Sequence, residues 1–145
     1  MIVVDAKSKI LGRAASEIAQ IAKNTDEEIA VLNSEHVAIS GEKPKVLDNY
    51  KTKYDRGRRD RGPYFPKRPD KIFKRTIKNM TSDSKKGREQ KSQIKTYLGT
   101  PSEFKQEEKT ELEAREGKDL KNRNYVKLGE VSEHIGWTPK IEVEY

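Results

Sequence analysis

The residues with the clearest chemical potential are cations crowded into the middle of the chain. The stretch DRGRRDRGPYFPKRPDKIFKRT, residues 55–76, holds nine Lys and Arg and three acids. Guanidinium and ammonium groups bind phosphate, and the guanidinium fork can do so through two parallel hydrogen bonds. Because Gly and Pro recur among these cations, residues 53–68 are expected to form a basic arm without regular structure, which can follow an irregular phosphate path.

The charge of the whole chain is segregated rather than mixed. The formal net charge of the 145 residues is +7. Residues 43–95 contain 19 Lys and Arg against 6 Asp and Glu, whereas the rest of the chain contains 12 basic and 18 acidic residues. A block of one sign indicates a polyanionic partner, since a face that serves only solubility usually mixes signs.

RNA is the polyanion that the sequence favours. If about 6 to 10 of these cations met phosphates, affinity would fall by about 10³- to 10⁵-fold between 50 and 200 mM salt. A free DNA-binding regulator would need base-edge contacts to compensate, and the sequence has no recognition-helix motif, zinc-finger pattern or RRM aromatic signature. A large, shaped and permanently bound RNA is therefore the expected partner.

The candidate RNA-binding residues lie in the arm and in two helices predicted behind it. A helix starting at Pro69 has an apolar inner face that ends at Met80, and a helix over 84–97 carries cations on one side at spacings of 3 and 4. In the arm, the aromatic pair Tyr64 and Phe65 either stacks on an unpaired base or covers the protein's own core. The candidate cations are Lys53, Arg56, Arg58, Arg59, Arg61, Lys67, Arg68, Lys71, Lys74, Arg75, Lys78, Arg88, Lys91 and Lys95.

Candidates for catalysis are fewer. The two histidines, His36 and His134, show no metal-ligand or triad spacing, and residues 40–43 are a poor phosphate-loop mimic, with an acid and no first glycine. Asp5 follows an apolar run, so it is either a ligand beyond a strand end or a turn residue at a helix entry. Together with the pair at 27–28, Asp5 leaves a metal-dependent RNA-processing enzyme as an alternative. We assign no catalytic residue, no metal and no cofactor.

The elements that position these residues follow from apolar periodicity. Residues 2–4 and 29–32 are short apolar runs typical of buried strands. Between them, apolar positions 10, 14, 18 and 21 form one stripe, which predicts a helix capped by Ser8. Strand, helix and strand within about thirty residues predict a βαβ unit with a parallel strand pair.

The remaining elements are shorter. Residues 37–39 form a third apolar run, a polar helix is predicted from Glu42 to Tyr50, and residues 125–128 and 129–136 favour a strand and a short helix. Residues 103–123 alternate in sign with almost no apolar content, so we expect a charged excursion, either a solvated helix or a loose loop. The length suits one domain over residues 1–145.

The sequence contains no cysteine and no apolar run near the roughly 20 residues of a membrane span. The first residues, MIVVDAKSK, resemble neither a signal peptide nor a transit sequence. The expected location is the cytoplasm.

Four stretches in order resemble the large-subunit ribosomal protein L-thirteen family. They are IVVDAKSKILGRAASEIAQIAK, IAVLNSEHVAISG, YFPKRPDKIFKRTIKNM and KKGREQKSQIKTYLGTP, and together they cover roughly residues 2 to 101. The R-P-D-x-I-F-K-R-T-I form and YVKLGEVSEHIG resemble the archaeal and eukaryotic branch. Two stretches depart from the family pattern: residues 81–84, where the family usually has Leu-Pro and a basic run, and residues 103–119, which lack a familiar counterpart.

This resemblance implies a three-layer α/β/α domain with a small, mostly parallel four-stranded sheet. It also implies a structural, non-enzymatic constituent of the large subunit of the cytoplasmic ribosome, which binds ribosomal RNA early in assembly beside neighbouring ribosomal proteins. No membrane partner and no obligate homo-oligomer are expected. By position, the resemblance adds Arg13, Lys85 and Lys86 to the RNA-facing residues. Some family members also bind messenger RNA, so a free translational regulator is a second alternative.

Overall fold

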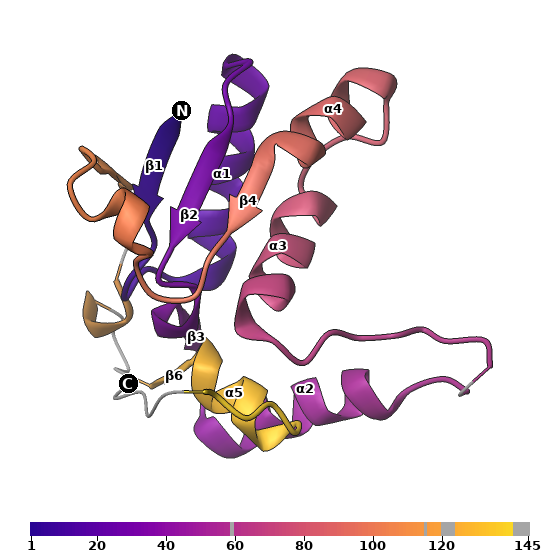
Figure 1. Cartoon of the computed structure of the whole chain (residues 1–145). Coiled ribbons are helices and arrows are strands. Elements are labelled where there is room, and N and C mark those ends of the chain that lie inside the picture. The colour runs from indigo at the N-terminus through magenta and orange to yellow at the C-terminus, as the bar shows by residue number, and fades with distance from the viewer. Residues whose placement is uncertain (59, 115, 120–123, 141–145) are drawn as a thin grey trace.

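The main sheet is parallel and four-stranded in the computed structural model, which describes residues 1–58, 60–114, 116–119 and 124–140. Its strands lie in the order β4 (Ile94–Thr96), β2 (Ile29–Leu32), β1 (Ile2–Asp5) and β5 (Thr110–Glu111). Helix α1 (Leu11–Asn24) connects β1 to β2 (Figure 1). The predicted βαβ unit is confirmed, and so is the α/β class.

The two faces of the sheet have different covers. Alternate strand residues, such as Val4 and Val31, enter the main core with α1 and with α3 (Pro69–Asn79). On the opposite face, Val3, Ala30 and Leu32 pack with Phe104, whose ring lies 5.2 Å from that of Tyr97. Helices therefore gather on one face, and a thin layer with the 3-10 turn Ser102–Phe104 covers the other.

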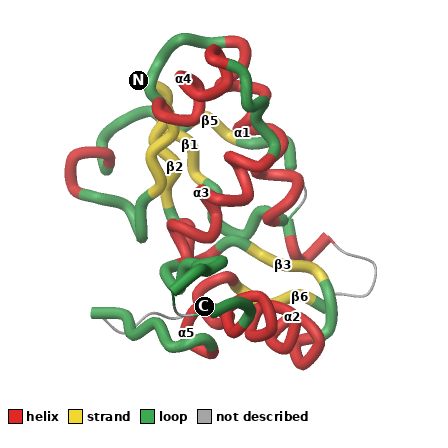
Figure 2. Tube along the Cα trace, turned by 90° about the vertical axis from the view of Figure 1, so that its right-hand side faces the viewer, coloured by secondary structure: helices red, strands yellow, loops and turns green. Residues whose placement is uncertain are grey.

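A second group of elements lies beyond the carboxyl ends of β1 and β2. Strand β3 (Ala38–Ser40) pairs antiparallel with β6 (Tyr125–Lys127), and helices α2 (Lys43–Asp55) and α5 (Leu128–His134) pack beside this pair (Figure 2). The third apolar run is thus mostly a strand, and it belongs to a separate two-stranded sheet. Helix α2 also runs past its predicted end near Tyr50 to Asp55.

The prediction that Ser8 caps α1 is wrong. The helix begins at Leu11 with Ile10 in the N-cap position, and Ser8 has a left-handed backbone with φ of 65°. The Ser8 amide donates to the His36 carbonyl at 3.0 Å, and the Lys9 carbonyl accepts from Ala38 at 2.8 Å. These bonds hold the segment in extended form against β3, so the helix starts later.

The predicted helix over residues 84–97 is wrong at its carboxyl end. Helix α4 (Lys85–Gln93) starts with Ser84 as its cap, since the Ser84 hydroxyl accepts from the Gly87 amide at 3.1 Å. The chain then becomes β4, and Ile94 pairs with Ile29 and is fully buried. The open edge of β2, brought close by folding, supplies backbone partners that the local helical pattern does not reveal.

The charged excursion is also more ordered than predicted where the structure describes it. It contributes β5 at the edge of the main sheet, and Phe104 and Leu112 are buried. Residue 115 and residues 120–123 of this prediction lie outside the described residues. Within the described chain, no helix combines the length and the apolar character needed to span a membrane.

Candidate RNA-binding surface

The basic arm joins α2 to α3. Lys53 lies in the last turn of α2, whereas the chain from Arg56 to Arg68 has no helix or sheet strand in its described part (Figure 1). Two backbone hydrogen bonds between Arg58 and Gly62, of 3.2 and 2.9 Å, close a turn at the tip. Gly57 has a φ of 98°, and a Cβ there would clash with the Gly62 carbonyl, so this turn requires glycine.

The two aromatic residues of the arm have separate roles. Phe65 packs against the main core, with its ring edge-on to that of Tyr50 at 6.0 Å. The Arg75 guanidinium lies 5.2 Å from the Phe65 ring centroid. Tyr64, by contrast, is 68% exposed. Of the two interpretations, covering the core therefore holds for Phe65, and stacking on a base stays a prediction for Tyr64 alone.

The exposed arm cations project from this anchor. Arg56, Arg58 and Arg61 are exposed and form no ion pair with any described residue. Lys67 lies over the Tyr54 ring at 5.3 Å from its centroid. Arg68 donates to Asp70 at 3.1 Å, so part of its charge is already neutralised. Arg59 is outside the described residues.

Helix α3 separates its apolar and basic faces as predicted. Ile72, Phe73 and Ile77 are buried, and the outward cations are Lys71, Arg75 and Lys78. Lys74 is half-buried, and its pKa is lowered, first by burial and then by the nearby charges of Lys78 and Lys95.

The expected inner position of Met80 is wrong, because Met80 is the C-cap of α3 and is 46% exposed. It lies past the last helical residue, where the chain turns away from the core.

Among the described residues, some of the candidate cations on α4 and β4 pair with acidic side chains and others do not. Lys85, Lys86 and Arg88 are exposed on α4. Lys91 donates to Asp83 at 2.6 Å, and this hydrogen bond lowers the pKa of Asp83.

The prediction that Lys95 shares a helical side with Lys91 is wrong. Lys95 stands on β4 and pairs with Glu28 at 3.2 Å. The free positive charge of this region is therefore concentrated in the first turns of α4.

Helix α1 also contributes polar surface. Arg13 was the one residue of this helix that was expected to face RNA. Arg13 is exposed, and Gln20 and Lys23 lie on the polar side of the same helix, beside α4. The sequence could have indicated that Gln20 and Lys23 are exposed, because their spacing places them opposite the apolar stripe of the helix. Only the fold shows that this side of α1 faces the start of α4.

The residues of the metal-enzyme alternative do not assemble. Asp5 ends β1 and accepts from Asn33 at 2.9 Å and from the Lys7 amide at 3.0 Å, which makes it a turn residue. Glu27 and Glu28 precede β2, at the opposite end of the parallel pair. Glu27 accepts from the terminal ammonium of Met1, and Glu28 pairs with Lys95.

A metal site is likewise absent from the part of the chain that the structure describes, where no three His, Asp or Glu side chains are grouped to hold an ion. Within the described fold, the three carboxylates of the metal-enzyme alternative therefore do not come together, and no other group of side chains there forms a metal site.

Comparison with known proteins identifies the family. The family model "Ribosomal protein L13" matches residues 1–103. Among similar proteins is the large ribosomal subunit protein uL13 of Methanosarcina barkeri, 42% identical over 137 residues, covering 94% of this chain and 98% of that protein. The protein of the same name from Archaeoglobus fulgidus is 42% identical and covers 93% and 87%. That from Methanocaldococcus jannaschii is 38% identical and covers 94% and 98%. The chain belongs to the ribosomal protein L13 family.

Proposed function

We propose that this chain is a structural constituent of the large subunit of the cytoplasmic ribosome, where it binds ribosomal RNA and supports early assembly. The assignment to the large subunit rests on family membership and on relatives that carry that name over almost their whole length. The family is one of ribosomal proteins and not of enzymes, so the expectation that the chain is not an enzyme is confirmed. Its partners are then ribosomal RNA and neighbouring ribosomal proteins.

The observation that carries the RNA-binding part is the exposed and unpaired charge of the arm. Arg56, Arg58 and Arg61 have no acidic partner among the described residues, and they stand on a loop fixed at one end by Phe65. Cations without an acidic partner gain more binding free energy from contact with a phosphate backbone than cations that already form an ion pair within the protein. The whole domain, residues 1–145, serves as the platform for this surface.

The exposed cations of α3 and α4, the two helices that follow the arm in the chain, extend the proposed contact beyond the arm. Desolvation has already lowered the pKa of Lys74, and a phosphate placed nearby would favour its charged form again. Phosphate contacts of this kind fix position and orientation and carry no direct sequence information. The surface therefore suits RNA segments that are recognised by shape.

Charge reversal in the arm tests the proposal. A full-length variant with Arg56→Glu, Arg58→Glu and Arg61→Glu is expressed in cells beside the wild type, and both are followed on sucrose gradients. We expect an unchanged circular dichroism spectrum and loss of the variant from large-subunit fractions. The matched control reverses three exposed lysines outside the candidate RNA-binding residues, Lys7, Lys105 and Lys109.

Two outcomes would contradict the proposal. Normal incorporation of the arm variant would show that these cations do not face RNA. A wild-type chain found mostly outside ribosomal particles would instead favour the free messenger-RNA regulator.

A further inference from the structure

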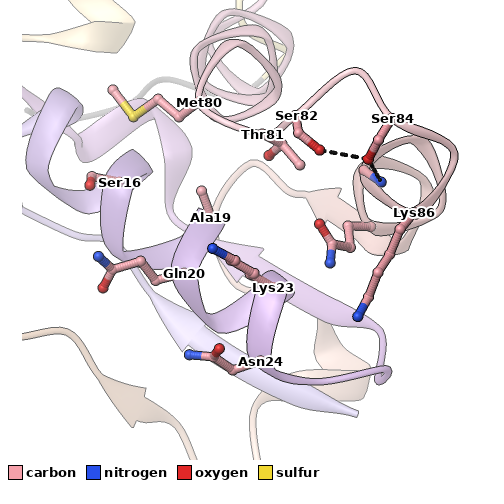
Figure 3. A pocket seen from close by; sticks show the side chains of 12 residues that line it. Ser16, Ala19, Gln20, Lys23, Asn24, Met80, Thr81, Ser82, Ser84 and Lys86 are labelled. Carbon is pink, nitrogen blue, oxygen red and sulfur yellow. Dashed lines mark hydrogen bonds between the residues drawn. The ribbon is translucent and has the colours of Figure 1, made fainter.

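A groove separates α1 from the α3–α4 connection. It has a volume of about 790 Å³, which lies in the range of small-molecule sites (Figure 3). Gln20 and Lys23 line it from α1, Lys86 and Gln90 line it from α4, and Met80 lies at the end of α3. The groove adjoins the exposed cations of α4, so a ligand there would be continuous with the proposed RNA surface.

Gln90 is the feature that points to a ligand. Gln90 is only 8% exposed, it lines the groove, and no hydrogen bond joins its side chain to another described residue. Among the described residues, the fully buried side-chain atoms without a partner belong to Ser34, Asp70, Gln93 and Ser132, so the carboxamide of Gln90 is still within reach of a partner in the groove. A carboxamide offers two donor hydrogens and one acceptor oxygen, so its complement is a group that accepts and donates side by side. The edge of a nucleobase is such a group.

The groove walls supply the other parts of a nucleotide site. Lys23 and Lys86 approach from α1 and α4 (Figure 3), and neither pairs with an acidic side chain among the described residues. The N-terminus of α4, a helix of nine residues, adds partial positive charge beside Lys86. The thioether of Met80 is polarizable and partly exposed, which suits contact with the face of an aromatic ring.

A tight turn before α4 forms one border of the groove. A Cβ on Gly87 would clash with the carbonyl oxygen of Ser82, so α4 packs directly on the preceding connection. The hydroxyls of Ser82 and Ser84 are 2.9 Å apart, and Ser84 caps the helix. This connection contributes Thr81, Ser82 and Ser84 to the lining of the groove.

We propose that this groove binds one unpaired nucleotide of RNA, with the base edge hydrogen-bonded to Gln90 and the phosphate between Lys23 and Lys86. The inference rests on the proposed function and deepens it, because it adds a hydrogen-bonded contact with a base edge to a surface whose other proposed polar contacts are with phosphates. A good two-point contact between a carboxamide and a base edge discriminates by about 5- to 150-fold.

The test uses assembled large subunits. Particles containing the wild type, Gln90→Met or the control Gln106→Met are treated with dimethyl sulfate and a carbodiimide, which modify unpaired base edges. We expect one base that is protected in wild-type particles to become about fivefold or more reactive with Gln90→Met and to stay protected with Gln106→Met.

Two results would overturn the inference. One is unchanged base reactivity in Gln90→Met particles, and the other is a wild-type particle map in which a protein segment or solvent fills the groove. Both leave the proposed function standing, because they require the chain to be present in the large subunit. If Gln90→Met fails to fold or to enter particles, the wild-type map decides alone. Failure of the wild type itself to enter large subunits would instead refute the proposed function.

Discussion

Salt dependence of RNA binding reports directly on the number of arm cations that meet phosphates. The variant Arg56→Gln, Arg58→Gln and Arg61→Gln removes three charges that have no acidic partner among the described residues. These side chains are exposed, and the fold anchors the arm through Phe65 instead. The change should therefore leave the core intact while removing phosphate contacts.

The magnitude follows from counterion release. Each phosphate contact contributes about 0.7 to the slope of log affinity against log salt for a single strand and about 0.9 for a duplex. Three lost contacts lower the slope by about 2 to 2.7. Between about 50 and 200 mM KCl, the wild type should then lose about 20- to 40-fold more affinity than the variant loses.

Filter binding or fluorescence anisotropy with a large-subunit ribosomal RNA transcript measures both slopes. The control carries the same change of net charge through Lys7→Gln, Lys105→Gln and Lys109→Gln, and its slope should equal that of the wild type. If the control lowers the slope as much as the arm variant does, net charge alone drives binding and the arm cations do not form a local binding surface.

Three further measurements test the fold that presents this surface. Gly87→Ala should lower the free energy of unfolding by about 1 to 3 kcal/mol in urea titrations because its Cβ meets backbone, whereas Gly12→Ala, whose Cβ meets nothing within 4 Å, should not. Phe65→Ala should cost about 2 kcal/mol for a half-buried ring, and Tyr64→Ala less than about 0.5 kcal/mol; equal costs would contradict the assigned roles. Burial lowers the pKa of His36 below 6.5, so the unfolded chain binds the proton first. Stability should therefore fall as the pH drops from about 6.5 toward the folded pKa, and a His36→Gln variant should lose this part of the pH dependence.

Features that depend on residues close together in the chain could be predicted from the sequence alone. The apolar stripe of α1 and the inner face of α3 follow from helical spacing, and the first strand pair follows from two apolar runs with a helix between them. The segregation of charge is a property of composition alone. The motifs of residues 2–101 also carried the resemblance to the family, which comparison confirmed.

Which charges pair with one another, and which strands share a sheet, depends on the folded chain as a whole. Lys95 and Glu28 are separated by 67 positions, and they pair because β4 lies beside β2. The same packing turns the end of a predicted helix into a strand, and it buries Gln90 against a groove whose walls come from distant segments. Local periodicity reports the preferences of adjacent residues, whereas these outcomes depend on partners that only chain closure brings within reach.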